Sequence, residues 1–165
     1  RNNMCYAWMY GCAKMGMHFV AYGPSSLEVD KAVLQKAQET AKCTGATIEV
    51  SHEETCLRGA DVIYCDIWAS MGEEDKIPQR VALLTPFRVT EELMAKTGNP
   101  DCIFLHCLPS FHDFNTDMAS ARMAAGYDIR EVTDQVFHST NSHVFDEAEN
   151  RLHAQKAVMA TLMAR

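Results

Sequence analysis

Short apolar runs alternate with amphipathic segments along the whole chain. The apolar runs, closed by turn residues, predict strands at Met17–Tyr22, Ile48–Val50, Asp61–Asp66 and Cys102–His106. The longer segments predict helices at Met4–Gly16, Leu27–Thr44, Glu53–Arg58, Gln79–Leu84, Thr90–Lys96 and Glu147–Met163. Strands that alternate with helices are joined by right-handed crossovers. The pattern therefore predicts an α/β fold, a single domain over residues 1–165 with a parallel sheet and helices on both faces.

The last predicted helix has an apolar side, and the sequence pattern predicts no element for it to pack against. Its members are Ala148, Leu152, Met159, Leu162 and Met163. An apolar stripe on a surface helix is normally buried against another element. We expect this helix to pack on a neighbouring domain or to close this one.

Composition narrows the class of protein. With 47% hydrophobic and 22% charged residues in 165, the chain is typical of an ordinary globular domain. A net charge of -7 argues against nucleic acid or an anionic membrane as partner, since both require clustered Lys and Arg. No apolar stretch approaches the roughly 18 residues of a spanning helix. Small molecules and other subunits are the expected partners.

The cysteines indicate a reducing compartment. There are seven, an odd number without a repeated spacing, so a disulfide framework is not expected and a cytoplasmic location is. The sequence opens on Arg1-Asn2-Asn3 without a Met, which suggests a piece of a longer polypeptide. Any targeting signal would then lie upstream.

Two chemically rich stretches follow predicted strands. Asp66 ends the third strand and Cys107 follows the fourth. Ligands of parallel sheets bind outside the carboxyl ends of the strands. The two stretches are therefore expected at one ligand site.

Cys107 admits several roles. It could be a nucleophile with His112 as its base, although no third orienting residue is evident. It could join His106 and His112 on zinc, although no second pair of ligands stands at the usual spacing. It could be a buried cysteine beside a satisfied histidine, or a thiol that lines a substrate pocket. These alternatives remain open on the residues alone.

The loop after Asp66 combines an acceptor, a hydroxyl and backbone N–H groups. Asp66 is followed by Ser70, Met71 and Gly72 in a polar segment, a combination able to clamp the ammonium and carboxylate of an α-amino acid. The alternative is a helix cap at Ser70 with Glu73 three residues on.

Two further polar positions lie near helix starts. Asn2-Asn3 precedes the first helix as a cap or as amides turned on a ligand. Arg151 lies in an early turn of the last helix, where the helix dipole disfavours a cation. It either pairs with Glu147 on the surface or faces a ligand.

These stretches together resemble the second half of ornithine carbamoyltransferase. The matching pieces are Arg1-Asn2-Asn3-Met4, Asp66-x-x-x-Ser70-Met71-Gly72, His106-Cys107-Leu108-Pro109 with Phe111-His112-Asp113, and Val144-Phe145-Asp146-Glu147-Ala148-Glu149-Asn150-Arg151. They occur in the family's order and cover nearly the whole chain. The resemblance implies a Rossmann-like domain that binds ornithine. An aspartate-specific relative lacks the Ser70-Met71-Gly72 loop and a putrescine-specific one departs there, so this loop favours ornithine.

The resemblance also implies roles for residues. Asn3 and the backbone of Met71 would hold the ornithine carboxylate, and Asp66 with Ser70 the α-ammonium. The reacting amine must also lose a proton, and Asp66 or Cys107 could assist as its acceptor, so Asp66 counts among the catalytic residues.

The carbamoyl phosphate side is assigned in the same way. Cys107 would line the pocket beside the reacting amine, while the Leu108 carbonyl and Arg151 address the carbamoyl group. Cys107 and Arg151 complete the implied catalytic set. No cofactor and no metal is expected.

The partners follow from the same resemblance. The family joins carbamoyl phosphate to the side-chain amine of L-ornithine, giving citrulline and phosphate, and assembles as a trimer or a multiple of trimers. An amino-terminal domain with a Ser-Thr-Arg-Thr motif holds most of the carbamoyl phosphate, and that motif is absent here. The chain by itself is therefore expected to be inactive. The alternatives are a non-catalytic amino-acid-binding module and a thiol or zinc enzyme.

Overall fold

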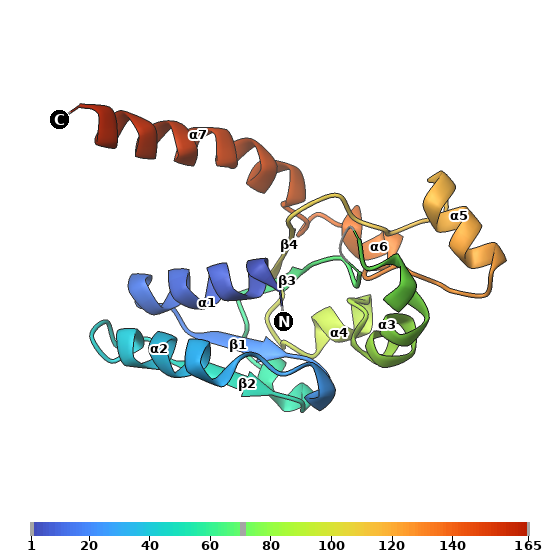
Figure 1. Cartoon of the computed structure of the whole chain (residues 1–165), viewed down its shortest axis with the longest axis horizontal. Helices are drawn as coiled ribbons and strands as arrows, with labels where there is room; N and C mark the ends of the chain where they lie inside the picture. Colours follow the sequence, from blue (N-terminus) through green and yellow to red (C-terminus); the bar gives the residue numbers. More distant parts are fainter. Residues whose placement is uncertain (1, 70–71, 165) are drawn as a thin grey trace. The chain divides into compact units, whose positions relative to one another are not determined.

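The structure is a computed structural model that describes residues 2–69 and 72–164 (Figure 1). The chain forms two compact units, Arg1–Arg58 and Gly59–Arg165. Each unit holds one pair of parallel strands, β1 with β2 and β3 with β4. The predicted α/β class with parallel strands is therefore confirmed, and among the described residues the strands are joined two by two. The extent of the predicted domain stays a prediction.

The first unit packs two helices against each other and against a strand pair. Its elements are α1 (Asn3–Met15), β1 (Phe19–Tyr22), η1 (Ser25–Leu27), α2 (Lys31–Ala41), β2 (Ile48–Ser51) and η2 (Glu54–Leu57). Its core joins Met9 and Ala13 of α1 to Ala37 and Ala41 of α2 and to Ile48 of β2. The alanines let the two helix backbones approach closely, because they add almost no side-chain volume between them.

Local signals set both ends of α1. The Asn2 side chain accepts a hydrogen bond from the Cys5 N–H at 2.9 Å, which satisfies one of the free N–H groups of the first turn. Gly16 ends the helix with φ 74, a left-handed conformation that glycine adopts without strain. The predicted start and stop of this helix are confirmed within one residue.

The second unit is built on the β3–β4 pair. Its elements are β3 (Val62–Cys65), η3 (Glu74–Lys76), α3 (Ile77–Leu84), η4 (Thr85–Phe87), α4 (Glu91–Ala95), β4 (Ile103–His106), α5 (Asp117–Ala124), α6 (Asp134–Phe137) and α7 (Val144–Met163). The β4 residue Phe104 is fully buried. Its backbone also bonds the segment ahead of α7, with Phe104 N–H donating to the Asn141 carbonyl and His143 N–H to the Phe104 carbonyl. The start of α7 is thereby anchored to β4.

The last helix begins earlier than the sequence pattern predicts. It starts at Val144, not Glu147, because Val144 is buried directly after the segment that pairs with Phe104. The pattern also missed α5 and α6. Helix α6 has four residues, too few to display a helical period.

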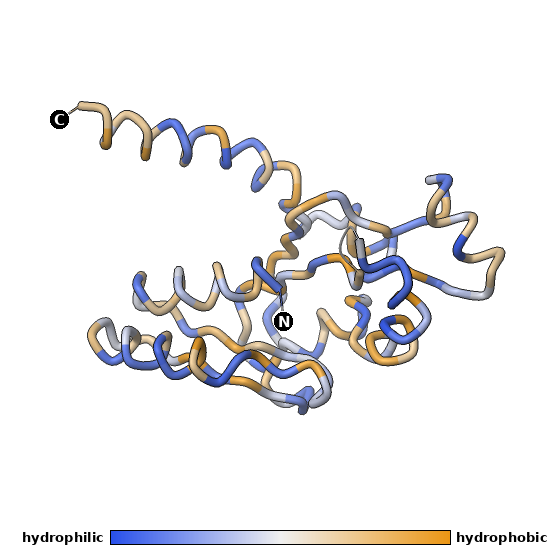
Figure 2. The backbone as a smooth tube through the Cα atoms, in the orientation of Figure 1, coloured by the Kyte–Doolittle hydropathy of each residue, from blue (hydrophilic) through white to orange (hydrophobic). Residues whose placement is uncertain are grey.

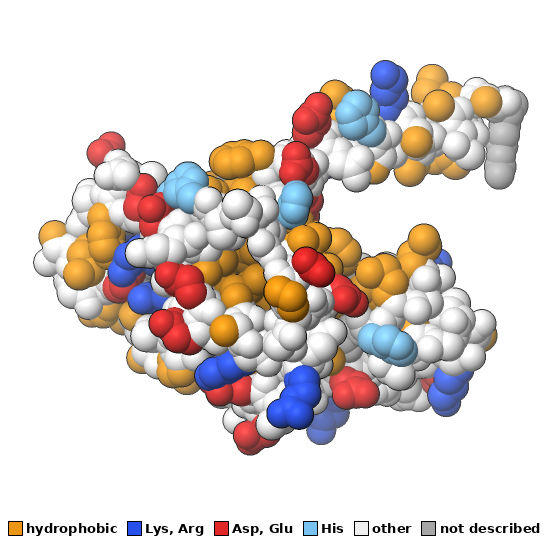
Figure 3. Space-filling view, turned by 180° about the vertical axis from the view of Figure 1, so that it is seen from behind, with side chains coloured by type: hydrophobic (Ala, Val, Ile, Leu, Met, Phe, Trp, Pro, Cys, Tyr) orange, Lys and Arg blue, Asp and Glu red, His pale blue; other side chains and the backbone are white. Residues whose placement is uncertain are grey.

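Helix α7 leaves its apolar side exposed within the described part of the unit. Figure 2 shows apolar and polar residues interleaved along α7, and Figure 3 shows orange side chains along its projecting end. The large apolar residues exposed on this helix are Phe145, Leu152, Val158, Met159, Leu162 and Met163. Among the described helices, none is long and apolar enough to cross a membrane. The expected packing of α7 on a neighbouring domain stays a prediction.

The cap of α2 gives a test of the first unit. Asp30 Oδ1 accepts hydrogen bonds from Ala32 N–H at 2.9 Å and Val33 N–H at 3.2 Å. We predict that Asp30→Ala lowers the free energy of unfolding by about 1 kcal/mol, the usual worth of such a cap. Asp30→Asn keeps the acceptor and should stay within about half of that loss. Urea denaturation of both variants measures the difference, and equal losses would contradict the capping role.

Candidate functional site

The register of β3 against β4 brings the two predicted strand-end residues together. Cys65 pairs with His106, so Asp66 and Cys107 leave the sheet side by side at its carboxyl edge. The Cys107 thiol donates a hydrogen bond to Asp66 Oδ1 at 3.0 Å, and the Ile67 N–H donates to the same oxygen at 2.8 Å. The structure thus unites residues 41 positions apart. The prediction that they share one edge is confirmed.

The environment keeps the Cys107 thiol protonated. Burial raises its pKa to about 12, and the hydrogen bond to Asp66 and the charge of that carboxylate act in the same direction. A hydrogen bond with Tyr64 acts the other way. A thiol with so high a pKa is a poor nucleophile near neutral pH, because the thiolate is the reactive form. The geometry therefore does not favour the thiol-enzyme alternative.

His106 fixes the turn that follows Cys107. Its side chain is fully buried, and its Nδ1 accepts a hydrogen bond from the Leu108 N–H at 2.9 Å. The proton therefore belongs on Nε2, which lies 3.1 Å from Glu131 Oε1. Leu108 takes a left-handed backbone conformation with φ 50. The imidazole holds that conformation by bonding the N–H of the same residue.

Glu131 is a site residue that the sequence reasoning missed. It is fully buried, and its Oε1 accepts hydrogen bonds from Phe111 N–H at 2.6 Å and Ser110 Oγ at 2.8 Å. A buried carboxylate is retained only with such partners. The available signal was weak: Glu131 stands beside Val132 and two residues after Ile129, both of which are buried, but Arg130 precedes it directly.

Helix α7 reaches the same sheet edge through Glu147. The Glu147 side chain accepts a hydrogen bond from the His106 N–H at 3.2 Å. Arg151 follows one turn later, on the same helix face as Glu147. The described residues offer Arg151 no ion pair, so the predicted surface pair with Glu147 is not seen. Arg151 is exposed.

Of the remaining predicted ligand residues, the structure describes some and leaves others out. Asn2 caps α1, while Asn3 is exposed in the first turn with no side-chain hydrogen bond inside residues 2–69 and 72–164. Ser70 and Met71 lie outside the described residues. Their roles, and that of Asn3, stay predictions.

His112 is not positioned as a base for the Cys107 thiol. Its Nδ1 lies 2.7 Å from Asp134 Oδ1, and its ring stacks on Phe137 with centroids 3.8 Å apart. His106 is likewise engaged by Leu108 and Glu131. The suggested zinc set of Cys107 with the two histidines therefore has no support in the geometry.

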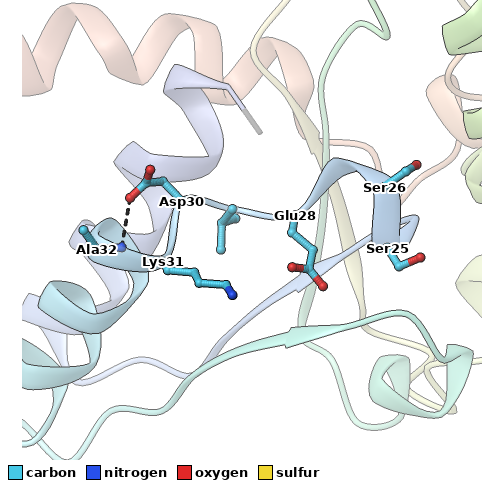
Figure 4. A pocket seen from close by; sticks show the side chains of 7 residues that line it. Ser25, Ser26, Glu28, Asp30, Lys31 and Ala32 are labelled. Carbon is cyan, nitrogen blue, oxygen red and sulfur yellow. Dashed lines mark hydrogen bonds between the residues drawn. The ribbon is translucent and has the colours of Figure 1, made fainter.

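A separate hollow lies in the first unit, within the curve of residues 25–32 (Figure 4). It has a volume of about 540 Å³ and is lined by Ser25, Ser26, Glu28, Val29, Asp30, Lys31 and Ala32. One continuous segment forms it, and no predicted site residue lines it. We therefore take the β3–β4 edge, and not this hollow, as the candidate functional site.

A parallel α/β fold with polar groups converging at the carboxyl edge belongs to the class of domains that bind small ligands there. Comparison with known proteins identifies the family to which this domain belongs. Residues 1–162 match the family model described as aspartate/ornithine carbamoyltransferase, Asp/Orn binding domain. The chain belongs to this carbamoyltransferase family.

Two relatives with similar sequences support this family assignment. The chain is 59% identical over 168 residues to the catabolic ornithine carbamoyltransferase of Clostridium perfringens (strain 13), matching all of this chain and 51% of that protein. It is 45% identical over 165 residues to the catabolic ornithine carbamoyltransferase of Bacillus licheniformis, covering 99% of this chain and 49% of that protein. The chain thus spans about half the length of these relatives. The resemblance seen in the sequence is confirmed.

Solved structures of the family share the fold. The anabolic ornithine carbamoyltransferase of Campylobacter jejuni matches with a TM-score of 0.81 at 30% identity, over 99% of this chain and 48% of that one. The Pyrococcus furiosus ornithine carbamoyltransferase matches with a TM-score of 0.78 at 38% identity, over 94% of this chain and 44% of that one.

Alkylation kinetics test the state of the Cys107 thiol. With a pKa of about 12, only about one thiol in 10⁴ is ionised at pH 8, so we predict that iodoacetamide labels Cys107 at least about tenfold more slowly than the exposed Cys43. The rate should still be rising at pH 10. Asp66→Asn should speed labelling, because the carboxylate raises the thiol pKa. Peptide mass spectrometry follows each cysteine, and fast labelling of Cys107 at pH 7 would contradict the assignment.

Unfolding measurements test Glu131. We predict that Glu131→Ala lowers the free energy of unfolding by about 1–3 kcal/mol, because the Phe111 N–H and Ser110 hydroxyl lose their acceptor. Glu131→Gln retains a carbonyl oxygen and should lose clearly less. Urea denaturation compares the pair, and an equal loss in both would show that the hydrogen bonds do not hold the loop.

Proposed function

We propose that this chain supplies the ornithine-binding half of an ornithine carbamoyltransferase, which transfers the carbamoyl group of carbamoyl phosphate to L-ornithine. The observation that carries the proposal is the Asp66–Cys107 pair at the carboxyl edge of β3 and β4, in a chain that matches the Asp/Orn binding domain. In the reaction the ornithine side-chain nitrogen forms a bond to the carbamoyl carbon. The bond from that carbon to the phosphate oxygen breaks, and phosphate leaves.

The pair of residues suits the proton problem of this reaction. An alkyl ammonium titrates near 10.4, so at pH 7 only about one part in 10³ to 10⁴ is the neutral nucleophile. A partly buried site favours the neutral amine, and the Asp66 carboxylate is an acceptor for the departing proton or for the α-ammonium. The protonated Cys107 adds no second negative charge beside the amine. Cys107 therefore shapes the pocket and remains a thiol throughout.

Arg151 and the Leu108 carbonyl address the carbamoyl group in this proposal. Arg151 shares a helix face with Glu147, whose carboxylate bonds the backbone at the end of β4. A guanidinium near that edge stabilises charge that develops on the carbamoyl oxygen. Because α7 begins at Val144, Arg151 lies beyond the first helical turn, where the helix dipole opposes a cation only weakly.

A second domain that binds carbamoyl phosphate completes the proposed site. The exposed apolar side chains of α7 supply a surface for it, and the chain spans about half the length of its relatives. Two substrates held between two domains react with a high effective molarity, which supplies much of the rate. The Ser70-Met71-Gly72 loop would act as a lid over ornithine and hold its carboxylate together with Asn3.

The assembly and location belong to the same proposal. We expect a trimer or a multiple of trimers in the cytoplasm, with no nucleic acid or membrane partner. The net charge of -7 and the seven cysteines support this expectation.

The decisive experiment measures citrulline formation by complementation. We predict no turnover for the chain alone and turnover after addition of the amino-terminal half of the Clostridium perfringens relative. By calorimetry, Asp66→Asn should weaken ornithine binding by about 10- to 150-fold, the equivalent of a hydrogen bond to a charged group. Citrulline production by the chain alone would contradict the proposal that a second domain must bind carbamoyl phosphate.

His143→Ala is the matched control for this experiment. His143 is bonded to Asp146 at the start of α7, and its loss should leave ornithine affinity unchanged. A non-catalytic amino-acid-binding module is the second candidate function. It predicts ornithine binding that persists in the complemented protein without citrulline, and the proposed role of Arg151 on the carbamoyl group argues against it.

A further inference from the structure

A group of possible metal ligands lies on the second unit, separate from the Asp66–Cys107 pair. His112, Asp134 and His138 each offer a ligand atom, and these atoms all lie within 4.8 Å of one another. His112 Nδ1 is 2.7 Å from Asp134 Oδ1, and His138 Nε2 is 3.5 Å from the same oxygen. Two imidazole nitrogens and a carboxylate oxygen therefore lie close enough to bind one ion after small side-chain shifts.

Backbone geometry holds two of the three ligands in place. Asp134 is the first residue of α6 and His138 is its carboxyl-terminal cap, so the pair lies one helical turn apart on one face. Thr133 caps the helix by accepting a hydrogen bond from the Val136 N–H. Neither side chain has to reorient to face the other.

The third ligand is brought in by the buried Glu131. Its carboxylate binds Ser110 Oγ and the Phe111 N–H, one residue before His112. Glu131 itself stands three residues before Asp134. The same carboxylate thereby ties the loop carrying His112 to the segment that carries the other two ligands.

Ring packing sets the orientation of the two imidazoles. The His112 ring stacks on Phe137 with centroids 3.8 Å apart and an angle of 7°, and meets the His138 ring edge-on at 5.2 Å. Phe137 is buried and provides an apolar backing. Ligands oriented by their surroundings bind a metal more tightly than free ones, because less conformational freedom is lost.

The charge and the donor set suit zinc. Zinc takes imidazole nitrogen and carboxylate oxygen and accepts three protein ligands with water in the remaining position. Asp113 Oδ2 lies 4.0 Å from His112 Nδ1 and adds a second carboxylate beside the group. The Asp134 and His138 side chains are 51% and 60% exposed, so an ion and its water can enter from solvent.

A comparison within the chain separates this cluster from an ordinary surface pair. His143 and Asp146 also form a His–Asp contact, with Nδ1 2.8 Å from Oδ2. No third ligand accompanies that pair among the candidate groups of the described residues. The third group and the aromatic backing distinguish the His112 cluster.

We propose that His112, Asp134 and His138 form a zinc-binding site, independent of the proposed ornithine site. Binding displaces any proton shared between His112 Nδ1 and Asp134, and the three side chains become ligands of one ion. The site ties the loop after β4 to α6. Zinc should therefore stabilise the second unit without a role in the chemistry at Asp66 and Cys107.

The test titrates metal-stripped, untagged protein with zinc chloride in a calorimeter under reducing conditions. One zinc per chain is expected, and His138→Ala and Asp134→Ala should each weaken it by about tenfold or more, the loss caused by removing even a supporting group of a metal site. Zinc should also raise the melting temperature of the parent protein and not that of His138→Ala. The apo melting temperatures verify that both variants fold.

Two matched variants exclude other zinc sites. His143→Ala removes the exposed pair without a third ligand, and Cys107→Ser removes the thiol at the other site; both should retain parental zinc affinity. Cobalt substituted for zinc should show no sulfur-to-metal charge-transfer band, since no cysteine is a ligand. Unchanged affinity in His138→Ala, or an equal loss in Cys107→Ser, would overturn the site.

Discussion

The parallel ladder between β3 and β4 is the constraint on which the chemistry of this protein depends. It sets Cys65 opposite His106, so that Asp66 and Cys107 leave the sheet together. A shift of register by one residue would turn one of these side chains toward the other face of the sheet. The hydrogen bond between thiol and carboxylate, and the high thiol pKa that accompanies it, both follow from that register.

A single buried carboxylate then organises the surroundings of the strand end. Glu131 lies beside Nε2 of His106, and its carboxylate accepts hydrogen bonds from Ser110 and Phe111 in the loop that follows β4. A buried carboxylate is unfavourable unless donors converge on it, and here the Phe111 N–H and the Ser110 hydroxyl do so, with the His106 imidazole 3.1 Å away. The same residue shapes the left-handed turn at Leu108 through His106 and positions the loop that carries His112. The hydrogen bonds of the buried Glu131 therefore also determine where the loop that carries His112 lies on the surface.

Helix α7 connects the strand end to the outside of the unit. Its first turns are held by Phe104 and by Glu147, whereas its later turns expose Leu152, Met159 and Leu162. One helix thus has an anchored end beside the candidate site and an exposed apolar end. This arrangement supports the proposal that a second domain completes the candidate site.

The sequence by itself determined the local features: the parallel α/β pattern, the capped ends of α1, and the placement of Asp66 and Cys107 at strand ends. It also determined the family, because four separated motifs occur in order. Such features depend on periodicity and on residues a few positions apart. Only the tertiary structure decided that Cys107 bonds Asp66, that Glu131 is the buried anchor, and that His112 meets Asp134 and not the thiol. These contacts join residues 20 to 41 positions apart, and their formation depends on strand register and core packing, which a local pattern does not encode.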